Sequence, residues 1–481
     1  MRLFVDFSVE SCYVFVKTTA KRRAVMMTAP KRLRFRRTLS MPGLLKVIRA
    51  RFERIPDPVR HRKSPLVDHL MAGMAMFFFK FPSMLTFDRR ARGPEARPEL
   101  VHNLKTLFGI GHVPCDTSLR ERLDEVDPQA LRPAFKAVFS EFQRGGGLEA
   151  MPTIDGRYLV SIDGTEHFCS RSIKCKRCSQ RNLRSGETEY FHQMVCACLV
   201  APGTPFVLPF MPEPVLKSDG AKKNDCESNA IRRLLPDIRR EHPHLKLCVL
   251  MDGLHSKAPQ TRLLRELGMS FIIGAKHGDH KILYEQLAVD GETCEITSPD
   301  GTRHVFRWRN GAELNNSNRD LWVNVLEYRE LVPERRVRKA GGEVRVEPAR
   351  ERTFGWITDI ELRRDRLMEV MRAGRSRWKI ENETFNTLKS FDNLEHSYGH
   401  GKNWLGSLMP TIMLLEYLVE NVLNLCCQVH RAVRTTFHAR TEMWKIMCAF
   451  ILTSRLGGWE DLMRKAAPRL LWQRGPPAPA A

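Results

Sequence analysis

Two segments of the chain have an aspartate directly after an apolar run: S-I-D-G-T-E at 161–166 and C-V-L-M-D-G at 248–253. Far downstream, the helix-like segment R-W-K-I-E-N-E at 377–383 adds a glutamate. Hard divalent cations prefer carboxylate oxygens, and a pair of them about 3.5–4 Å apart promotes displacement at a phosphodiester. The three segments therefore predict a site for two Mg²⁺ or Mn²⁺ ions, with ligands from two strand ends and one helix face.

The periodicity around these segments predicts an α/β fold with a mixed sheet flanked by helices. Strands are expected at 158–163, 190–200, 205–210, 245–252 and 269–275, and helices at 222–240 and 257–267. The first three strands follow one another in hairpin order, and a helix separates the last two. Hairpin order followed by strand–helix–strand is typical of a mixed sheet.

Composition and periodicity divide the chain into six parts. After the sheet segments, alternation returns between about 280 and 360, which predicts a β-rich insertion before a final helical region. The parts are 1–40, a basic segment that is disordered or precedes the true start; 41–150, an N-terminal helical domain that binds DNA; 151–279, the first part of the sheet domain; 280–360, the β-rich insertion; 361–460, the completion of the sheet domain with C-terminal helices; and 461–481, a tail.

The charge of the chain indicates the class of its partner. Lys and Arg outnumber Asp and Glu by 78 to 55, which gives a formal net charge of +23. Residues 1–63 hold 17 basic and 4 acidic side chains, so more than half of the excess lies there. Such concentration favours a polyanion, and the basic runs at 31–63, 171–184 and 332–352 make DNA a better partner than a membrane surface. The alternative for each run is a solvated face that binds nothing.

The cysteines and the apolar segments bear on the location of the protein. Thirteen cysteines in a chain without a recognisable signal peptide favour reduced thiols in the cytoplasm over a disulfide framework. The most apolar stretches, 66–83 and 405–427, are interrupted by charged residues, so we expect no membrane span.

A cysteine-rich loop suggests a second kind of metal site. Cys175 and Cys178 have the spacing that lets two thiolates share one tetrahedral Zn²⁺, and Cys169 and His192 are candidates for the third and fourth ligands. The alternative is a basic loop whose cysteines bind no metal.

Helical phase distinguishes the two glutamates of the downstream segment. The face that carries Glu381 also carries Trp378 and Phe385, and it should pack against the sheet. Glu383 lies about 200° around the helix from Glu381. A carboxylate within an apolar face needs compensation, which a metal ion or Arg377 one turn earlier would supply. Glu381 is therefore the predicted third metal ligand.

The order D-G-T-E, V-L-M-D-G and R-W-x-I-E-N-E-x-F-N-T-L-K, followed by L-E-H-S-Y-G-H-G at 394–401, resembles prokaryotic insertion-sequence transposases of the DDE class. The resemblance covers about 110–430 and implies an RNase H-like catalytic core with a β-rich insertion between the second aspartate and the glutamate. It assigns five residues: the catalytic, metal-binding triad Asp163, Asp252 and Glu381, and the DNA-binding residues Arg377 and Lys389.

Two positions depart from the pattern of this group. The tyrosine expected three residues before Arg377 is Gly374, and Lys389 stands eight rather than seven residues after Glu381. The departures bear on Lys389 and on any DNA-hairpin intermediate, and they leave the triad intact.

The implied function is divalent-metal-dependent cleavage of DNA at transposon ends, followed by strand transfer into target DNA. Hydrolysis frees a 3′-hydroxyl, and the same site then directs that hydroxyl at a target phosphodiester. The expected partners are terminal inverted repeats and target DNA, bound by a homodimer or higher oligomer in a prokaryotic cytoplasm. Two alternatives stay open: an RNase H-like endonuclease without strand transfer, and a catalytically inactive DNA-binding descendant of a transposase.

Overall fold

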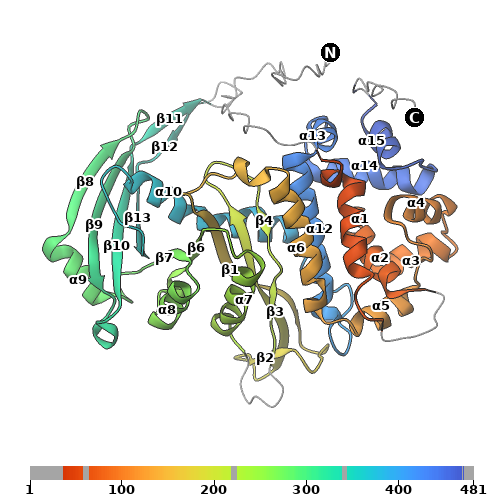
Figure 1. Cartoon of the computed structure of the whole chain (residues 1–481), viewed down its shortest axis with the longest axis horizontal. Helices are drawn as coiled ribbons and strands as arrows, with labels where there is room; N and C mark the ends of the chain where they lie inside the picture. The colour runs from red at the N-terminus through yellow and green to blue at the C-terminus, as the bar shows by residue number, and fades with distance from the viewer. Residues whose placement is uncertain (1–35, 58–63, 218–224, 339–343, 469, 471–481) are drawn as a thin grey trace. The chain divides into compact units, whose positions relative to one another are not determined.

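A computed structural model describes the chain except residues 1–35, 58–63, 218–224, 339–343, 469 and 471–481 (Figure 1). Most of the segment 1–40 and much of the tail 461–481 therefore lie outside the described residues. The chain forms two compact units. The helical unit comprises Met1–Ala150, Ile173–Lys176 and Ser390–Ala481, and the sheet unit comprises Met151–Ser172 and Arg177–Lys389.

The described part of the helical unit is built mainly from α-helices. They are α1 (Met41–Phe52), α2 (Leu66–Phe78), α3 (Met84–Arg92), α4 (Pro98–Phe108), α5 (Asp116–Asp124), α6 (Arg132–Arg144), α12 (Leu405–Cys426), α13 (Gln428–Thr435), α14 (Arg440–Thr453) and α15 (Trp459–Ala466). Ser40 and Ser83 cap α1 and α3 by accepting hydrogen bonds from backbone N–H groups of the first turn. The helical periodicity of 41–150 corresponds to α1–α6.

Helix α12 is the central apolar element of this unit and contacts α2, α5 and α6. By length and composition it could cross a membrane, yet 94% of its apolar window is buried inside the structure. A helix that is buried all round is typical of the core of a globular unit. The structure also changes the expected division of 361–460, because the C-terminal helices belong with the N-terminal helices and the sheet unit ends at Lys389.

One carboxylate joins distant parts of the chain within the helical unit. Asp124, the last residue of α5, accepts hydrogen bonds from the backbone N–H groups of Lys402 at 2.8 Å and Leu405 at 2.9 Å. Gly401 has a φ of 67°, and a Cβ there would lie 2.1 Å from Oδ1 of Asp124. The glycine that ends L-E-H-S-Y-G-H-G is thus required both by its left-handed backbone and by the close approach of Asp124.

The helical unit also contains a buried ionic cluster. Its members are Lys80, Asp392, Glu416, Glu420 and Arg440. Lys80 Nζ lies 2.6 Å from Oδ1 of Asp392, and Arg440 Nε lies 2.7 Å from Oε2 of Glu420. The three carboxylate side chains are at most 1% exposed. Two cations serve three carboxylates, and burial raises the pKa of Glu416 to about 7.

The sheet unit contains one large mixed sheet with the strand order β2-β3-β1-β6-β7-β13-β10-β9-β8, in which β4 and β5 also pair with β3. The strands are β1 (Tyr158–Ser170), β2 (Ser179–Asn182), β3 (Thr188–Val200), β4 (Leu208–Pro209), β5 (Glu213–Val215), β6 (Leu247–Met251), β7 (Ser270–Gly274), β8 (Glu292–Thr297), β9 (Arg303–Glu313), β10 (Trp322–Val332) and β13 (Arg350–Thr358). β1, β6 and β7 are parallel neighbours, and β3 is antiparallel to β1.

Helices accompany this sheet, so the architecture is mixed α/β. They are α7 (Glu227–Glu241), α8 (Ala258–Glu266), α9 (Lys281–Asp290), α10 (Leu367–Arg375) and α11 (Asn386–Phe391). α7 contacts β3 and β5, and both α8 and α10 contact β7. The predicted β-rich insertion proves to be continuous with the sheet, because β13 pairs with β7. A separate hairpin of β11 (Arg335–Arg338) and β12 (Val344–Glu347) lies outside the sheet.

Strand β1 is longer than predicted. The Asp-Gly pair at 163–164 predicts the end of the strand, but β1 continues to Ser170 because its second half pairs with β3. Asp163 therefore lies within a strand rather than at a strand end. Tertiary pairing has overridden the local turn signal of Asp-Gly.

Candidate active site

Asp163 lies within β1, and Asp252 directly follows β6, the parallel neighbour of β1. Ser161 of β1 pairs with Leu250 of β6, so the same register, continued by two residues, aligns Asp163 with Asp252. Asp252 follows the last residue of β6, and its Oδ1 accepts a hydrogen bond from the backbone N–H of Leu254. The register of the sheet thus places two aspartates that are far apart in the sequence side by side along the backbone.

Arg377 links Glu381 to Asp163 by contacting both carboxylates. Nη1 of Arg377 lies 3.1 Å from Oδ2 of Asp163 and 3.0 Å from Oε1 of Glu381. The backbone carbonyl of Arg377 accepts a hydrogen bond from the hydroxyl of Ser161 at 2.8 Å, which fixes this turn against β1. One guanidinium therefore holds two of the three predicted metal ligands. Glu383, which helical phase excluded, lies 3.8 Å from Lys379 instead.

The helix that carries Glu381 is irregular. It follows α10 without a break as a 3₁₀ turn, Ser376–Trp378, continues as a π-helix, Ile380–Phe385, and ends as α11. The expectation that Trp378 packs against the sheet is wrong, because its side chain is 47% exposed and lies beneath the guanidinium of Arg377. A π turn winds more widely than an α turn and so changes the phase of the residues around it. Such turns are frequent at functional sites.

The electrostatics of the triad favour a bound cation. Burial raises the pKa of Asp163 to about 7; Arg377 opposes this effect, and Glu381 adds to it. The side chains of Asp163 and Glu381 are 22% and 33% exposed, so solvent and ions have access to them. Mg²⁺ and Mn²⁺ prefer oxygen ligands, and the carboxylates of Asp163 and Glu381, which share one arginine, supply such oxygens.

Two further residues at this site gave no signal in the sequence. Glu227, the first residue of α7, places its carboxylate beside Gly164, where a Cβ would lie 2.2 Å from Oε1 of Glu227. His255 is buried, with Nε2 3.7 Å from Oδ1 of Asp252. Burial lowers the pKa of His255, which keeps this imidazole neutral. No local pattern could reveal Glu227, because its place depends on how α7 packs.

Lys389 is a half-buried residue of α11, two helical turns beyond Glu381. Arg377 is the basic residue that the structure places in direct contact with the triad. The assignment of Lys389 to DNA remains a prediction.

The candidate zinc ligands belong to both units of the chain. Within the sheet unit, Sγ of Cys178 lies 3.4 Å from Nε2 of His192. His192 pairs with Phe168 and the next residue, Cys169, pairs with Phe191, so Cys169 lies on the opposite face of the sheet from His192. The register therefore separates Cys169 from the ligand set.

Cys175 belongs to the segment Ile173–Lys176, which groups with the helical unit. In that unit its sulfur lies within 4.8 Å of a ring nitrogen of His400, a residue that the sequence had not indicated.

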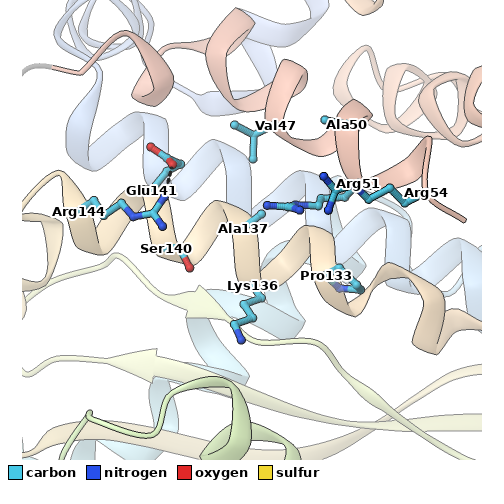
Figure 2. A pocket seen from close by; sticks show the side chains of 10 residues that line it. All are labelled: Val47, Ala50, Arg51, Arg54, Pro133, Lys136, Ala137, Ser140, Glu141 and Arg144. Carbon is cyan, nitrogen blue, oxygen red and sulfur yellow. Dashed lines mark hydrogen bonds and ion pairs between the residues drawn. The ribbon is translucent and has the colours of Figure 1, made fainter.

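A basic groove lies between α1 and α6 in the helical unit, with a volume of about 490 Å³ (Figure 2). Its lining comprises Val47, Ala50, Arg51, Arg54, Pro133, Lys136, Ala137, Ser140, Glu141 and Arg144. The acidic member, Glu141, is neutralised by Arg144 at 2.9 Å and accepts a hydrogen bond from Thr38. Arg51, Arg54 and Lys136 leave an excess of positive charge in a space large enough for a phosphate group. We call this feature the α1–α6 groove.

Comparisons with known proteins add little to this geometry. No protein-family model matches the chain, and no curated protein matches it. Among solved structures, the chain is similar to the cryo-EM structure of a piggyBac transposase synaptic complex with hairpin DNA, at 12% identity and a TM-score of 0.38. The match covers 88% of this chain and 78% of the other. At this TM-score it identifies neither a fold family nor a function.

Proposed function

We propose that the protein is a DDE transposase that cleaves DNA at transposon ends and transfers the freed strands into target DNA. The observation that supports the proposal best is the bridge from Arg377 to Asp163 and Glu381, with Asp252 directly after the neighbouring parallel strand. Residues from two strands and a distant helix converge at one place, as metal-dependent phosphodiester chemistry requires. The parallel pairing of the two aspartate-bearing strands in a mixed sheet also supports an RNase H-like core.

Asp163, Asp252 and Glu381 would hold Mg²⁺ or Mn²⁺, which supplies an activated water and neutralises charge at the reacting phosphate. Arg377 keeps two of these carboxylates oriented, and it gives the site a positive group that attracts the DNA backbone. The exposed ring of Trp378 beside Arg377 offers a face on which an unpaired base at a DNA end can stack.

The α1–α6 groove supports a role for the helical unit in holding DNA. Basic side chains that neutralise phosphates make affinity fall with salt, and each lost contact reduces the slope of log affinity against log salt by about 1. We expect that decrease for Lys136→Gln in a gel-shift titration, with Lys105→Gln of α4 as the control. An unchanged slope would show that Lys136 does not contact a phosphate of the DNA.

The decisive experiment combines cleavage and joining. Full-length protein, Mg²⁺ or Mn²⁺ and a labelled fragment that carries the terminal inverted repeat should yield nicked ends and labelled plasmid. Asp163→Asn and Asp252→Asn should lower both activities by at least about 100-fold, because each removes a metal ligand. Glu383→Gln, outside the triad, is the control.

Cleavage without joining would indicate an endonuclease, and binding without cleavage would indicate an inactive descendant. Full activity of either aspartate variant would refute the triad.

We also propose a structural Zn²⁺ at the cysteine-rich segment, with Cys178 and His192 of the sheet unit among its ligands. The C-x-x-C spacing and the short distance from Cys178 to His192 support it. Purified protein should contain about one zinc per chain. A content below about 0.2, or one unchanged by Cys178→Ser, contradicts the proposal.

We also propose that the protein acts in a prokaryotic cytoplasm as a DNA-bound homodimer or higher oligomer, because two transposon ends must be brought together. Light scattering of the protein with end DNA measures that stoichiometry, and one chain per complex would oppose it.

A further inference from the structure

Glu227 is a fourth carboxylate beside the triad. Gly164 directly follows Asp163 in β1, and a Cβ on Gly164 would lie 2.2 Å from Oε1 and 2.4 Å from Cδ of Glu227. The carboxylate therefore occupies space that the side chain of any other residue at position 164 would fill. The glycine of the D-G-T-E segment lies within a strand, so a turn does not explain it.

The carboxylate of Glu227 is held in this position by a neighbouring strand. Nε2 of Gln193, on β3, donates a hydrogen bond to Oε1 of Glu227 at 2.5 Å. Glu227 is half-buried and is subject to the negative charge of Asp252. No lysine or arginine among the described residues forms an ion pair with Glu227.

A half-buried carboxylate beside another carboxylate is costly unless a cation compensates it. Every carboxylate of the buried ionic cluster has a basic partner. Glu227 instead accepts a hydrogen bond from the amide of Gln193 and occupies the space that a Cβ on residue 164 would fill. We propose that Glu227 is a further ligand of the divalent cation site, together with Asp252, and that Gly164 is small so that this carboxylate can enter. The inference rests on the proposed metal-dependent function.

Direct metal binding tests the proposal without relying on activity. Mn²⁺ is titrated into the full chain with end DNA, and free Mn²⁺ is followed by electron paramagnetic resonance. Glu227→Gln keeps the length of the side chain and the contact with Gln193, and it should weaken Mn²⁺ binding by about 10- to 100-fold. Gly164→Ala, which displaces a carboxylate that is still present, should weaken binding in the same direction. Glu383→Gln is the matched control and should bind within about twofold of the unaltered protein.

The double variant Gly164→Ala/Glu227→Gln separates this role from a general disturbance of β1. If the glycine serves the carboxylate, the double variant binds Mn²⁺ about as weakly as Glu227→Gln alone. Unchanged binding by Glu227→Gln, with loss of binding by Asp252→Asn, would overturn the role of Glu227 and leave the proposed function standing. Absence of Mn²⁺ binding in the unaltered protein would overturn both.

Discussion

The triad and the buried ionic cluster each gather three carboxylates, but they differ in how those charges are neutralised. In the buried ionic cluster, Lys80 and Arg440 contact carboxylates that are almost completely excluded from solvent. In the triad, Arg377 contacts Asp163 and Glu381, whose side chains are 22% and 33% exposed. Complete enclosure with two cations is typical of structural ion networks. The partly exposed carboxylates of the triad, with one arginine between them, retain negative charge that is not neutralised, and a cation from solvent can reach them.

The largest expected difference between these regions concerns stability. Arg440→Met leaves buried carboxylates without their partner and should cost about 3–5 kcal/mol in the free energy of unfolding. Arg377→Met should cost about 1 kcal/mol or less in metal-free protein, because solvent reaches Asp163 and Glu381. Urea denaturation at pH 7 measures both values. Equal losses would show that the two regions are the same kind of network.

A smaller difference is expected in the response to metal. An ion that binds only folded protein stabilises it by about 2.7 kcal/mol at 100 times its Kd. Mn²⁺ should therefore raise the melting temperature of the unaltered protein and of Glu416→Gln, relative to EDTA. Asp163→Asn should show no such rise. A rise of the same size in Asp163→Asn would place the bound ion outside the triad.

The smallest expected effect is a pH dependence of the buried ionic cluster. Burial raises the pKa of Glu416 from 4.5 to about 7, so the folded protein holds this proton more tightly than the unfolded chain does. The stability that the proton contributes is present below pH 4.5 and is lost as pH rises towards 7. His430, whose pKa burial lowers to about 4, stays neutral over most of this range.

Glu416→Gln removes that titration. The melting temperature of the variant, relative to the unaltered protein, should therefore be higher at pH 8 than at pH 5. A difference that is constant with pH, or that changes in the opposite direction, contradicts the assignment to Glu416.

The sequence predicted the parts of the triad that depend on local pattern. Apolar runs that end at Asp163 and Asp252 indicated two buried strands, and the choice of Glu381 over Glu383 agrees with the contacts of Arg377. The regular helical phase behind this choice holds only in part, because Trp378, in the 3₁₀ turn before the π-helix, is exposed. A regular helical phase cannot anticipate a turn of different width.

Other features depend on contacts between distant segments and had no local signal. β1 continues past Gly164 because β3 pairs with it, and Glu227 reaches Gly164 because α7 packs beside β3 and β5. The sequence does not distinguish Cys169 from the other candidate zinc ligands. Its pairing with Phe191 places it on the opposite face of the sheet from His192. Sheet register, which depends on partner strands, decides such positions.

The hydrogen bond from Leu405 to Asp124 spans 281 residues of sequence, and this span has a consequence for biosynthesis. Because a ribosome adds about 5–20 residues per second, the groups that Asp124 binds emerge about 15–60 seconds after Asp124 itself. During that interval the apolar surfaces of α2 and α6 that α12 later covers have no permanent partner. The sheet unit is synthesised completely before the helical unit can close, and a chain that stops before residue 405 never closes it. A nascent chain of this protein therefore completes the synthesis of its sheet unit first and of its helical unit last.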